Sequence, residues 1–298
     1  MKEFFKYVLA TVVGIFAVTV IGMILFFMVI GAIIASTEKQ VTVQNNSMLV
    51  LDMSRQVVDR APNDPFEDLE IPGFTTVKTI GLDDIKTSLE KAVYDDRIKG
   101  VYLKLSAVPG GMASLEEIRN MLIAFKDSCD KPVYAYGDAY DQTAYYLATA
   151  ADKIVAHPMG SVDFRGLGGE FMFFKKTLEK IGVEAQIVRH GKFKAAVEPF
   201  MLDKMSEENR EQTMVYMNSL WNHMLKGISE SRNIPVDDLN RMADEVQTFK
   251  KGEDMVKSGL IDAAKYKDEV LADLREIAGI DKEKGIPVIG VSKYADVP

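Results

Sequence analysis

The run Gly100-Val101-Tyr102-Leu103-Lys104-Leu105, within an expected strand at residues 99–105, has the apolar and aromatic composition of a buried strand. It is followed by Val108-Pro109-Gly110-Gly111, a turn signal. Ser114 and Glu117 then form a capping box, which predicts the start of a helix. A second strand is expected at residues 132–136. A strand, a helix and a strand in this order predict a right-handed crossover between parallel strands.

The same alternation continues on both sides of this unit. Further strands are expected at 48–53, 154–156, 183–189 and 285–291, and helices at 82–93, 138–151, 171–181, 206–228 and within 236–278. Residues 60–74 contain three prolines and little periodicity, so we expect an exposed excursion there. The strand at 285–291 has no following element to pair with. The pattern predicts an α/β protein of repeated β-β-α or β-α units with a largely parallel sheet.

One transmembrane helix is expected before this domain. Residues 8–35 carry no charge, and as a helix they would extend about 42 Å, longer than the roughly 30 Å hydrocarbon core of a bilayer. The apolar core of a cleavable signal is shorter, so we interpret this segment as an uncleaved anchor. Lys2 and Lys6 make the N-terminal flank positive, which predicts that it stays in the cytoplasm.

This topology divides the chain into a short flank, an anchor, a tether and an exported domain. Their expected ranges are 1–7 for the cytoplasmic flank, 8–35 for the transmembrane anchor, 36–47 for the tether and 48–298 for the domain outside the cytoplasm.

Composition excludes several functions. The net charge is −8, which argues against nucleic acid as a partner. The one cysteine, Cys129, cannot form a disulfide within the chain. The three histidines lie on separate segments without a metal-binding motif, and there is no phosphate-binding loop, so we expect neither a metal nor a cofactor.

The segment His190-Gly191-Lys192-Phe193-Lys194-Ala195-Ala196-Val197-Glu198-Pro199-Phe200 is a candidate site for a general base. The expected strand at 183–189 leads into it, and Gly191 would let the chain turn so that Lys192 and Lys194 point the same way. If the phenylalanines and alanines around them exclude water, an amine there can act as a general base. The alternative is that both are ordinary solvated lysines.

Two turns at strand ends are candidate catalytic loops. Gly110 and Gly111 would present backbone N–H groups at the start of a helix, where they could stabilise an oxyanion, although a simple tight turn has the same sequence. Residues 138–146 form a second strand-to-helix turn, where a nucleophile would be exposed. That turn contains none.

The chain resembles the signal peptide peptidase A family, membrane-anchored serine proteases of the crotonase-like, or Clp-protease-like, fold. The resemblance rests on residues 191–200 followed by Met205-Ser206-Glu207, on residues 138–152 (DAYDQTAYYLATAAD), and on Gly259-Leu260-Ile261-Asp262. It covers most of the chain after about residue 48, and the single N-terminal anchor agrees with it.

The resemblance implies a Ser-Lys dyad in which Lys194, rather than Lys192, is the base. In the family the nucleophilic serine lies in a turn that corresponds to residues 137–146, and Gln142 stands at its position here. A glutamine amide cannot act as that nucleophile. By the same resemblance, Gly110 and Gly111 occupy a remnant of the oxyanion turn.

The long form of the family is an internal duplication, in which the N-terminal half supplies the lysine and the C-terminal half the serine. This chain resembles the anchor and the N-terminal half, so residues 1–298 alone are expected to be inactive. The resemblance implies cleaved signal peptides as substrates, a homo-oligomeric ring, and a bacterial inner membrane location with the bulk of the chain outside the cytoplasm. A non-catalytic assembly module of the same fold is one alternative. A coenzyme A enzyme of the crotonase-like fold is another, although export past an anchor argues against it.

Overall fold

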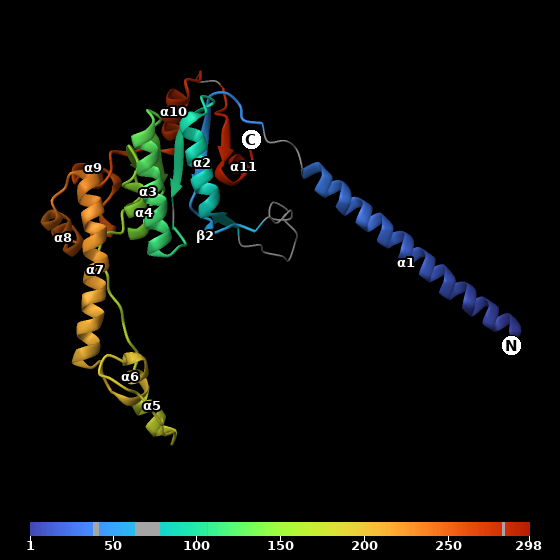
Figure 1. Cartoon of the computed structure of the whole chain (residues 1–298), viewed down its shortest axis with the longest axis horizontal. Helices are drawn as coiled ribbons and strands as arrows, with labels where there is room; N and C mark the ends of the chain where they lie inside the picture. The colour runs from blue at the N-terminus through green and yellow to red at the C-terminus, as the bar shows by residue number, and fades with distance from the viewer. Residues whose placement is uncertain (38–41, 63–77, 106, 282–283) are drawn as a thin grey trace.

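The computed structural model describes residues 1–37, 42–62, 78–105, 107–281 and 284–298 (Figure 1). Its elements in chain order are α1 (Lys2–Thr37), β1 (Ser47–Asp52), β2 (Gln56–Val58), β3 (Thr79–Gly81), α2 (Leu82–Tyr94), β4 (Ile98–Leu105), α3 (Met112–Ser128), β5 (Val133–Gly137), α4 (Gln142–Ala148), β6 (Lys153–Ala156), α5 (Lys175–Lys180), η1 (Ala195–Val197), α6 (Glu198–Met201), α7 (Glu207–Arg232), α8 (Val236–Asp244), η2 (Gln247–Phe249), α9 (Gly252–Lys257), β7 (Ala263–Ala264), α10 (Lys267–Ala278), β8 (Val288–Gly290) and α11 (Val291–Ala295). Most of the excursion predicted at 60–74 lies outside the described residues.

The predicted parallel sheet is confirmed. Six strands are ordered β7-β6-β5-β4-β1-β8, and every pairing between them is parallel. The expectation that the last strand has no partner is wrong, because β8 pairs with β1 through Met48–Val288, Leu49–Ile289 and Val50–Gly290. The strand order explains the pairing, since the connection through α10 crosses the sheet from β7 at one edge to β8 at the other.

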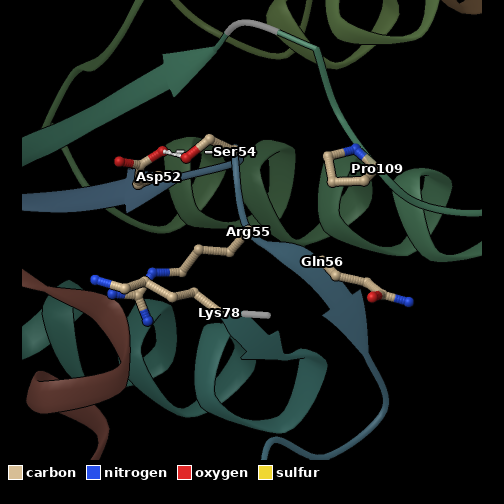
Figure 2. A pocket seen from close by; sticks show the side chains of 6 residues that line it. All are labelled: Asp52, Ser54, Arg55, Gln56, Lys78 and Pro109. Atoms are coloured by element: carbon tan, nitrogen blue, oxygen red, sulfur yellow. Dashed lines mark hydrogen bonds between the residues drawn. The ribbon is translucent and has the colours of Figure 1, made fainter. Parts of the chain in front are cut away.

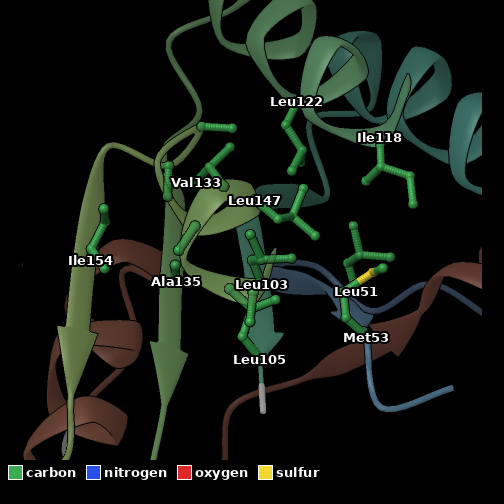
Figure 3. Close-up of a cluster of buried hydrophobic side chains, with 14 of the residues drawn as sticks. Leu51, Met53, Leu103, Leu105, Ile118, Leu122, Val133, Ala135, Leu147 and Ile154 are labelled. Carbon is green, nitrogen blue, oxygen red and sulfur yellow. The ribbon is translucent and has the colours of Figure 1, made fainter. Parts of the chain in front are cut away.

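The sheet lies between two layers of helices. Leu103 and Leu105 of β4 face α2, α3 and α4, because side chains alternate along a strand, and Figure 3 shows them packed with residues of α3, α4 and the neighbouring strands. Tyr102, on the opposite face of β4, packs with Val270 and Leu274 of α10. Both faces of β4 are therefore covered, which explains its nearly continuous apolar sequence.

Two helices begin elsewhere than the sequence predicts. The capping box expected at Ser114 does not form: α3 already begins at Met112, and Gly111 occupies its N-cap position without a side-chain hydrogen bond. The helix expected over 138–151 is shorter and begins at Gln142, because the Asp141 carboxylate accepts a hydrogen bond from the backbone N–H of Ala144 and caps it.

Helix α7 joins the body of the domain to a projecting arm, which we define as residues 171–206 (Figure 1). Its predicted start is confirmed, since Ser206 caps it by accepting a hydrogen bond from the N–H of Asn209. The buried apolar residues of α7, which include Leu225 and Ile228, lie in its C-terminal half, whereas Met214 in the N-terminal half is 46% exposed. The N-terminal half of α7 therefore carries the arm away from the sheet.

The arm contains less regular structure than the sequence predicts. The helix expected at 171–181 is limited to α5, and the expected strand at 183–189 is absent. A strand needs a neighbouring edge for its backbone hydrogen bonds, and the sheet pairings of the described residues include none with this segment.

Helix α1 has the length and composition of a membrane span. Within Lys2–Gly31, an 18-residue window has a mean hydropathy of 2.8, and none of the residues 2–31 is buried. Among the described residues it is the one helix that passes this test. The predicted transmembrane segment, residues 8–35, lies within α1.

Candidate active site

The structure brings two of the predicted site turns to one edge of the sheet. Gly110 and Gly111 follow β4, Gln142 follows β5, and the carboxyl ends of adjacent parallel strands lie at the same edge. Asp141 connects the two turns, because its Oδ2 accepts a hydrogen bond from the N–H of Val108 at 3.4 Å.

The glycine turn is open. Both glycines are exposed, and a Cβ built on Gly111 would meet no atom within 4 Å. The turn is held in place by β2, because the carbonyl of Pro109 accepts a hydrogen bond from the N–H of Val57 at 3.3 Å. The turn thus leaves backbone N–H groups accessible at the start of the α3 helix, where the macrodipole favours negative charge. An oxyanion role for Gly110 and Gly111 stays a prediction.

Gln142 has a structural role that the sequence did not reveal. Its Oε1 accepts hydrogen bonds from the N–H groups of Gly166 at 3.0 Å and Arg165 at 3.2 Å, and its Nε2 donates to the Gly166 carbonyl at 3.2 Å. Both ends of the amide are therefore occupied in fastening the loop after residue 164 to the start of α4. At the expected position of a nucleophile, the chain has a side chain that closes the turn.

Lys194 lies on the arm, directly before η1, and its side chain is exposed. Gly191 has φ +91°, so the predicted glycine turn is confirmed. The predicted extended segment is not found, because the chain bends after Gly191 and Lys194 occupies the N-cap position of η1. The apolar enclosure expected around the lysines does not form among the residues that the structure describes, since Phe193 and Phe200 are 54% and 46% exposed.

Lys194 and Gln142 belong to different parts of the molecule. Asn209, near the start of α7, contacts the arm, whereas the Trp221 ring lies 5.3 Å from the ring of Phe164 in the body. The helix between them rises about 18 Å, and Figure 1 shows α6 at the far end of α7 from α4. The fold of this chain therefore keeps Lys194 away from the turn that contains Gln142.

A buried carboxylate organises the arm around Lys194. The side chain of Glu198 is completely buried, and it accepts hydrogen bonds from the Ser206 hydroxyl at 2.5 Å, the Ser206 N–H at 3.1 Å and Asn209 Nδ2 at 3.0 Å. Arg189 completes the set with an ion pair at 3.5 Å. Burial raises the pKa of Glu198, but the hydrogen bonds from Ser206 and Asn209 and the charge of Arg189 outweigh it, so the pKa lies below the usual value of a glutamate.

Glu198 was missed as a site residue by reasoning from the sequence. Its signal was an acid between Val197 and Pro199 in an apolar segment, followed by the helix cap Ser206. Glu198 is bonded to Ser206 and Asn209 at the start of α7, and it also pairs with Arg189, so it joins both ends of the segment that carries Lys194. Glu198 is therefore a positioning residue for the segment that carries Lys194.

The arm has a large apolar surface. Val188 is fully exposed and Met172 is 73% exposed. Other exposed apolar residues of the arm and of the N-terminal half of α7 are Phe171, Phe174, Ile181, Val183, Phe193, Phe200, Met214, Val215 and Tyr216. Exposed apolar surface of this extent is typical of a protein or membrane contact.

A parallel sheet covered by helices, with a glycine turn and a second strand-to-helix turn at its carboxyl edge, defines an α/β protein, as expected for the Clp-protease-like, or crotonase-like, fold of the family that residues 191–200 resemble. Residues 125–281 match peptidase family S49, and the chain belongs to this family. The resemblance to signal peptide peptidase A that residues 191–200 indicated is thereby confirmed.

Named relatives agree with this assignment. Protease 4 of Haemophilus influenzae is 33% identical over 224 residues, which are 74% of this chain and 36% of that protein. The chloroplastic serine protease SPPA of Arabidopsis thaliana is 29% identical over 255 residues, 86% of this chain and 36% of that protein. A putative signal peptide peptidase SppA of Enterococcus faecium is 26% identical over 209 residues, 70% of this chain and 58% of that protein. The alignments thus span 36% of the length of the first two relatives.

Proposed function

We propose that this chain is the part of a membrane-anchored serine peptidase that supplies the general base, Lys194, and that the nucleophilic serine comes from outside residues 1–298. The substrates are cleaved signal peptides. Membership of peptidase family S49 supports the reaction class, and the name of the Enterococcus relative supports the substrate class.

The separation of Lys194 from Gln142 carries this proposal. A lysine base must come within hydrogen-bond reach of its serine, but Lys194 lies on the arm and Gln142 fills the nucleophile position of the body. A serine from a second domain or a neighbouring copy, docked against the arm, completes the dyad. The exposed apolar residues of the arm are the docking surface, and the assembly is a ring of copies in which burial by the neighbour encloses the lysine.

A serine hydrolase probe tests the proposal. We expect residues 1–298 alone to take up no fluorophosphonate and to hydrolyse no peptide, because Gln142 stands at the expected position of the nucleophile and, among the described residues, no hydrogen bond joins a serine to Lys194. The intact gene product should be labelled on a serine outside this range. Stoichiometric labelling of a serine within residues 1–298, measured by mass spectrometry, would contradict the assignment.

Gln142→Ser in residues 1–298 is the matched control. It restores a hydroxyl at the nucleophile position, but Lys194 remains remote and the contacts of Gln142 with residues 165 and 166 are lost. We expect no labelling above background. Labelling of this variant would mean that the arm can fold back onto its own body.

The anchor is the second part of the proposal. Residues 8–35 span the bacterial inner membrane with residues 1–7 in the cytoplasm, because Lys2 and Lys6 flank the span. The tether, 36–47, and the peptidase domain, 48–298, lie on the outer side.

Protease added to intact spheroplasts should remove the domain after residue 36 and leave the anchor with the cells. The measurement is an immunoblot with antibodies to the domain, and the control is a cytoplasmic protein that must stay intact. Complete protection of the domain would reverse the orientation.

A non-catalytic assembly module is the second candidate, and the occupied amide of Gln142 favours it. In that case the apolar arm serves assembly alone. The two functions differ in the role of Lys194: an assembly module tolerates its loss without any change in activity of the assembled protein.

A further inference from the structure

Two stretches of the chain on either side of α5 have an unpaired backbone. Residues 184–190 lead into the lysine segment, and residues 167–173 connect the body to the arm (Figure 1). Neither stretch contains a helix, a turn or a bend, so the chain is extended in both. Among the described residues, no hydrogen bond involves a backbone N–H or C=O group of either stretch. Each stretch therefore presents a free strand edge.

The stretch at 184–190 has the sequence of a strand without the environment of one. Ile187 and Val188 are β-branched, which is typical of strands. However, Ile187 is only partly buried, the other residues of the stretch are exposed, and Val188 is fully exposed. A strand-forming segment with a free backbone edge is a template for pairing with another chain. Sequence and exposure together indicate a partner strand from another chain.

The pocket beside the glycine turn offers a contrast, because its walls are bonded to one another. Asp52 accepts hydrogen bonds from the Ser54 hydroxyl, as Figure 2 shows, and from Lys104, both at 2.7 Å. The N–H of Gln56 donates to the Lys78 carbonyl at 3.0 Å. The two free strand edges have no such partners among the described residues.

We propose that residues 184–190 of one copy pair as an antiparallel β-strand with residues 167–173 of a second copy. An extended backbone presents N–H and C=O groups at the spacing that a strand edge requires. The second stretch contains Gly168 and Gly169, where an added Cβ would meet no atom within 4 Å. Glycine in a strand often marks the close approach of another backbone. Because the two edges differ, each copy uses one edge toward each neighbour, as in a ring.

The antiparallel direction follows from what flanks each stretch. Residue 190 is followed by the segment that carries Lys194, whereas residue 167 follows Gly166, which bonds to Gln142. Antiparallel pairing sets residue 190 opposite residue 167, so the lysine of one copy approaches the strand-to-helix turn of the next. The inference rests on the proposed function, in which Lys194 serves a turn that belongs to a neighbour.

Crosslinking of the full chain in detergent tests this pairing. Glu184→Cys, Met172→Cys and Leu167→Cys each add one thiol at an exposed residue, and the parental chain, whose one cysteine is Cys129, sets the background. Two differently tagged variants are mixed when dilute, concentrated and treated with a short bismaleimide. Residues 167 and 172 lie about 17 Å apart in a strand. We expect Glu184→Cys to crosslink to Met172→Cys, and its yield with Leu167→Cys to stay at background.

Adjacent prolines separate backbone pairing from side-chain contact. Neither Gln186 nor Ile187 uses its N–H within the described residues, so proline at either position should leave the single chain folded. Successive N–H groups of a strand point to opposite sides, so one of these two prolines removes a donor from the paired edge. Combined with Glu184→Cys, that proline should abolish the crosslink to Met172→Cys. Val188→Thr, which keeps its N–H, is the matched control and should retain the crosslink.

Three results would overturn the inference. The first is background yield in every pair, or undiminished yield in both proline variants. The second is a higher yield with Leu167→Cys than with Met172→Cys, which would refute the antiparallel direction. The third concerns a substrate peptide as the occupant. If residues 184–190 gain protection from hydrogen exchange on addition of acetyl-Ala-Leu-Ala-Leu-Ala-Leu-amide, but not with rising protein concentration, the edge binds peptides and pairing between copies is wrong.

The two proposals fail independently. Fluorophosphonate labelling of the intact gene product together with background crosslinking would refute the strand pairing alone. Crosslinking of Glu184→Cys to Met172→Cys without any labelling would refute the peptidase function and leave the strand pairing as a means of assembly.

Discussion

We expect Lys194→Ala to abolish peptide turnover by the assembled peptidase. A positioned general base is typically worth about 100-fold to 10,000-fold in rate, and the loss is larger when nucleophile and base act as a unit. The side chain of Lys194 is exposed, and within the described residues no ion pair or hydrogen bond holds it. Its removal should therefore leave folding and assembly intact. The measurement is kcat/KM on a peptide substrate, with sedimentation to confirm the assembly.

Lys192→Ala is the matched control, two residues away on the same turn. Lys192 forms an ion pair with Glu208 at 3.8 Å, and both side chains are exposed enough that the pair adds little stability. We expect this variant to keep most of its activity. Near wild-type turnover by Lys194→Ala, or loss of turnover only in Lys192→Ala, would show that the base is assigned to the wrong residue.

Glu198→Ala should loosen the arm and so reduce turnover strongly. The substitution leaves Arg189, Ser206 and Asn209 without their shared carboxylate, and a hydrogen bond to a charged group is typically worth about 1.5–3 kcal/mol. Because α7 packs on the body only through its C-terminal half, we expect this cost as local opening of the arm. Hydrogen exchange at residues 189–209 measures it directly.

Glu208→Ala is the control for Glu198→Ala, because Glu208 lies in the same part of α7 and is partly exposed. It should leave the protection of the arm unchanged. Wild-type protection in Glu198→Ala would mean that the buried carboxylate does not hold the lysine segment in place.

The pH dependence of the arm provides a second measurement of the same effect. The pKa of Glu198 is lowered in the folded protein, so its ionised form stabilises the fold above the ordinary glutamate pKa of about 4.3. This stabilisation by Glu198 is lost as the pH falls from about 4.3, the ordinary glutamate pKa, through the lower pKa that Glu198 has in the folded protein. The arm of the wild type should open progressively over this range, whereas opening in Glu198→Ala should depend less on pH.

Much of the fold could be predicted because it depends on local patterns. The apolar run at 100–105, the Pro-Gly-Gly turn after it and the helix beyond it are properties of neighbouring residues, and they are enough to indicate parallel strands joined by crossovers. The uncharged N-terminal segment is equally local, and α1 contains the predicted span. The signature at 191–200 led to the right family for the same reason, since its residues are contiguous.

Strand partners and burial depended on residues far apart in the chain. The strand after residue 285 pairs with β1, because α10 carries the chain from one edge of the sheet to the other. No feature of the strand's own sequence specifies this partner. The segment at 183–189 has a strand-like sequence but no edge to pair with. In both cases the hydrogen-bond partner, rather than the intrinsic propensity, decided the outcome.

In the candidate site, too, residue types could be read from the sequence, whereas their contacts depended on the tertiary structure. From the sequence, Lys194 was the candidate base and Gln142 an unreactive residue at the position of a nucleophile. Only the tertiary structure showed that Gln142 fastens a loop through both ends of its amide, that Glu198 is buried, and that α7 holds the arm away from the sheet. Residue type fixes which chemistry is available, whereas distance, burial and the saturation of hydrogen bonds arise from contacts between segments remote in the chain.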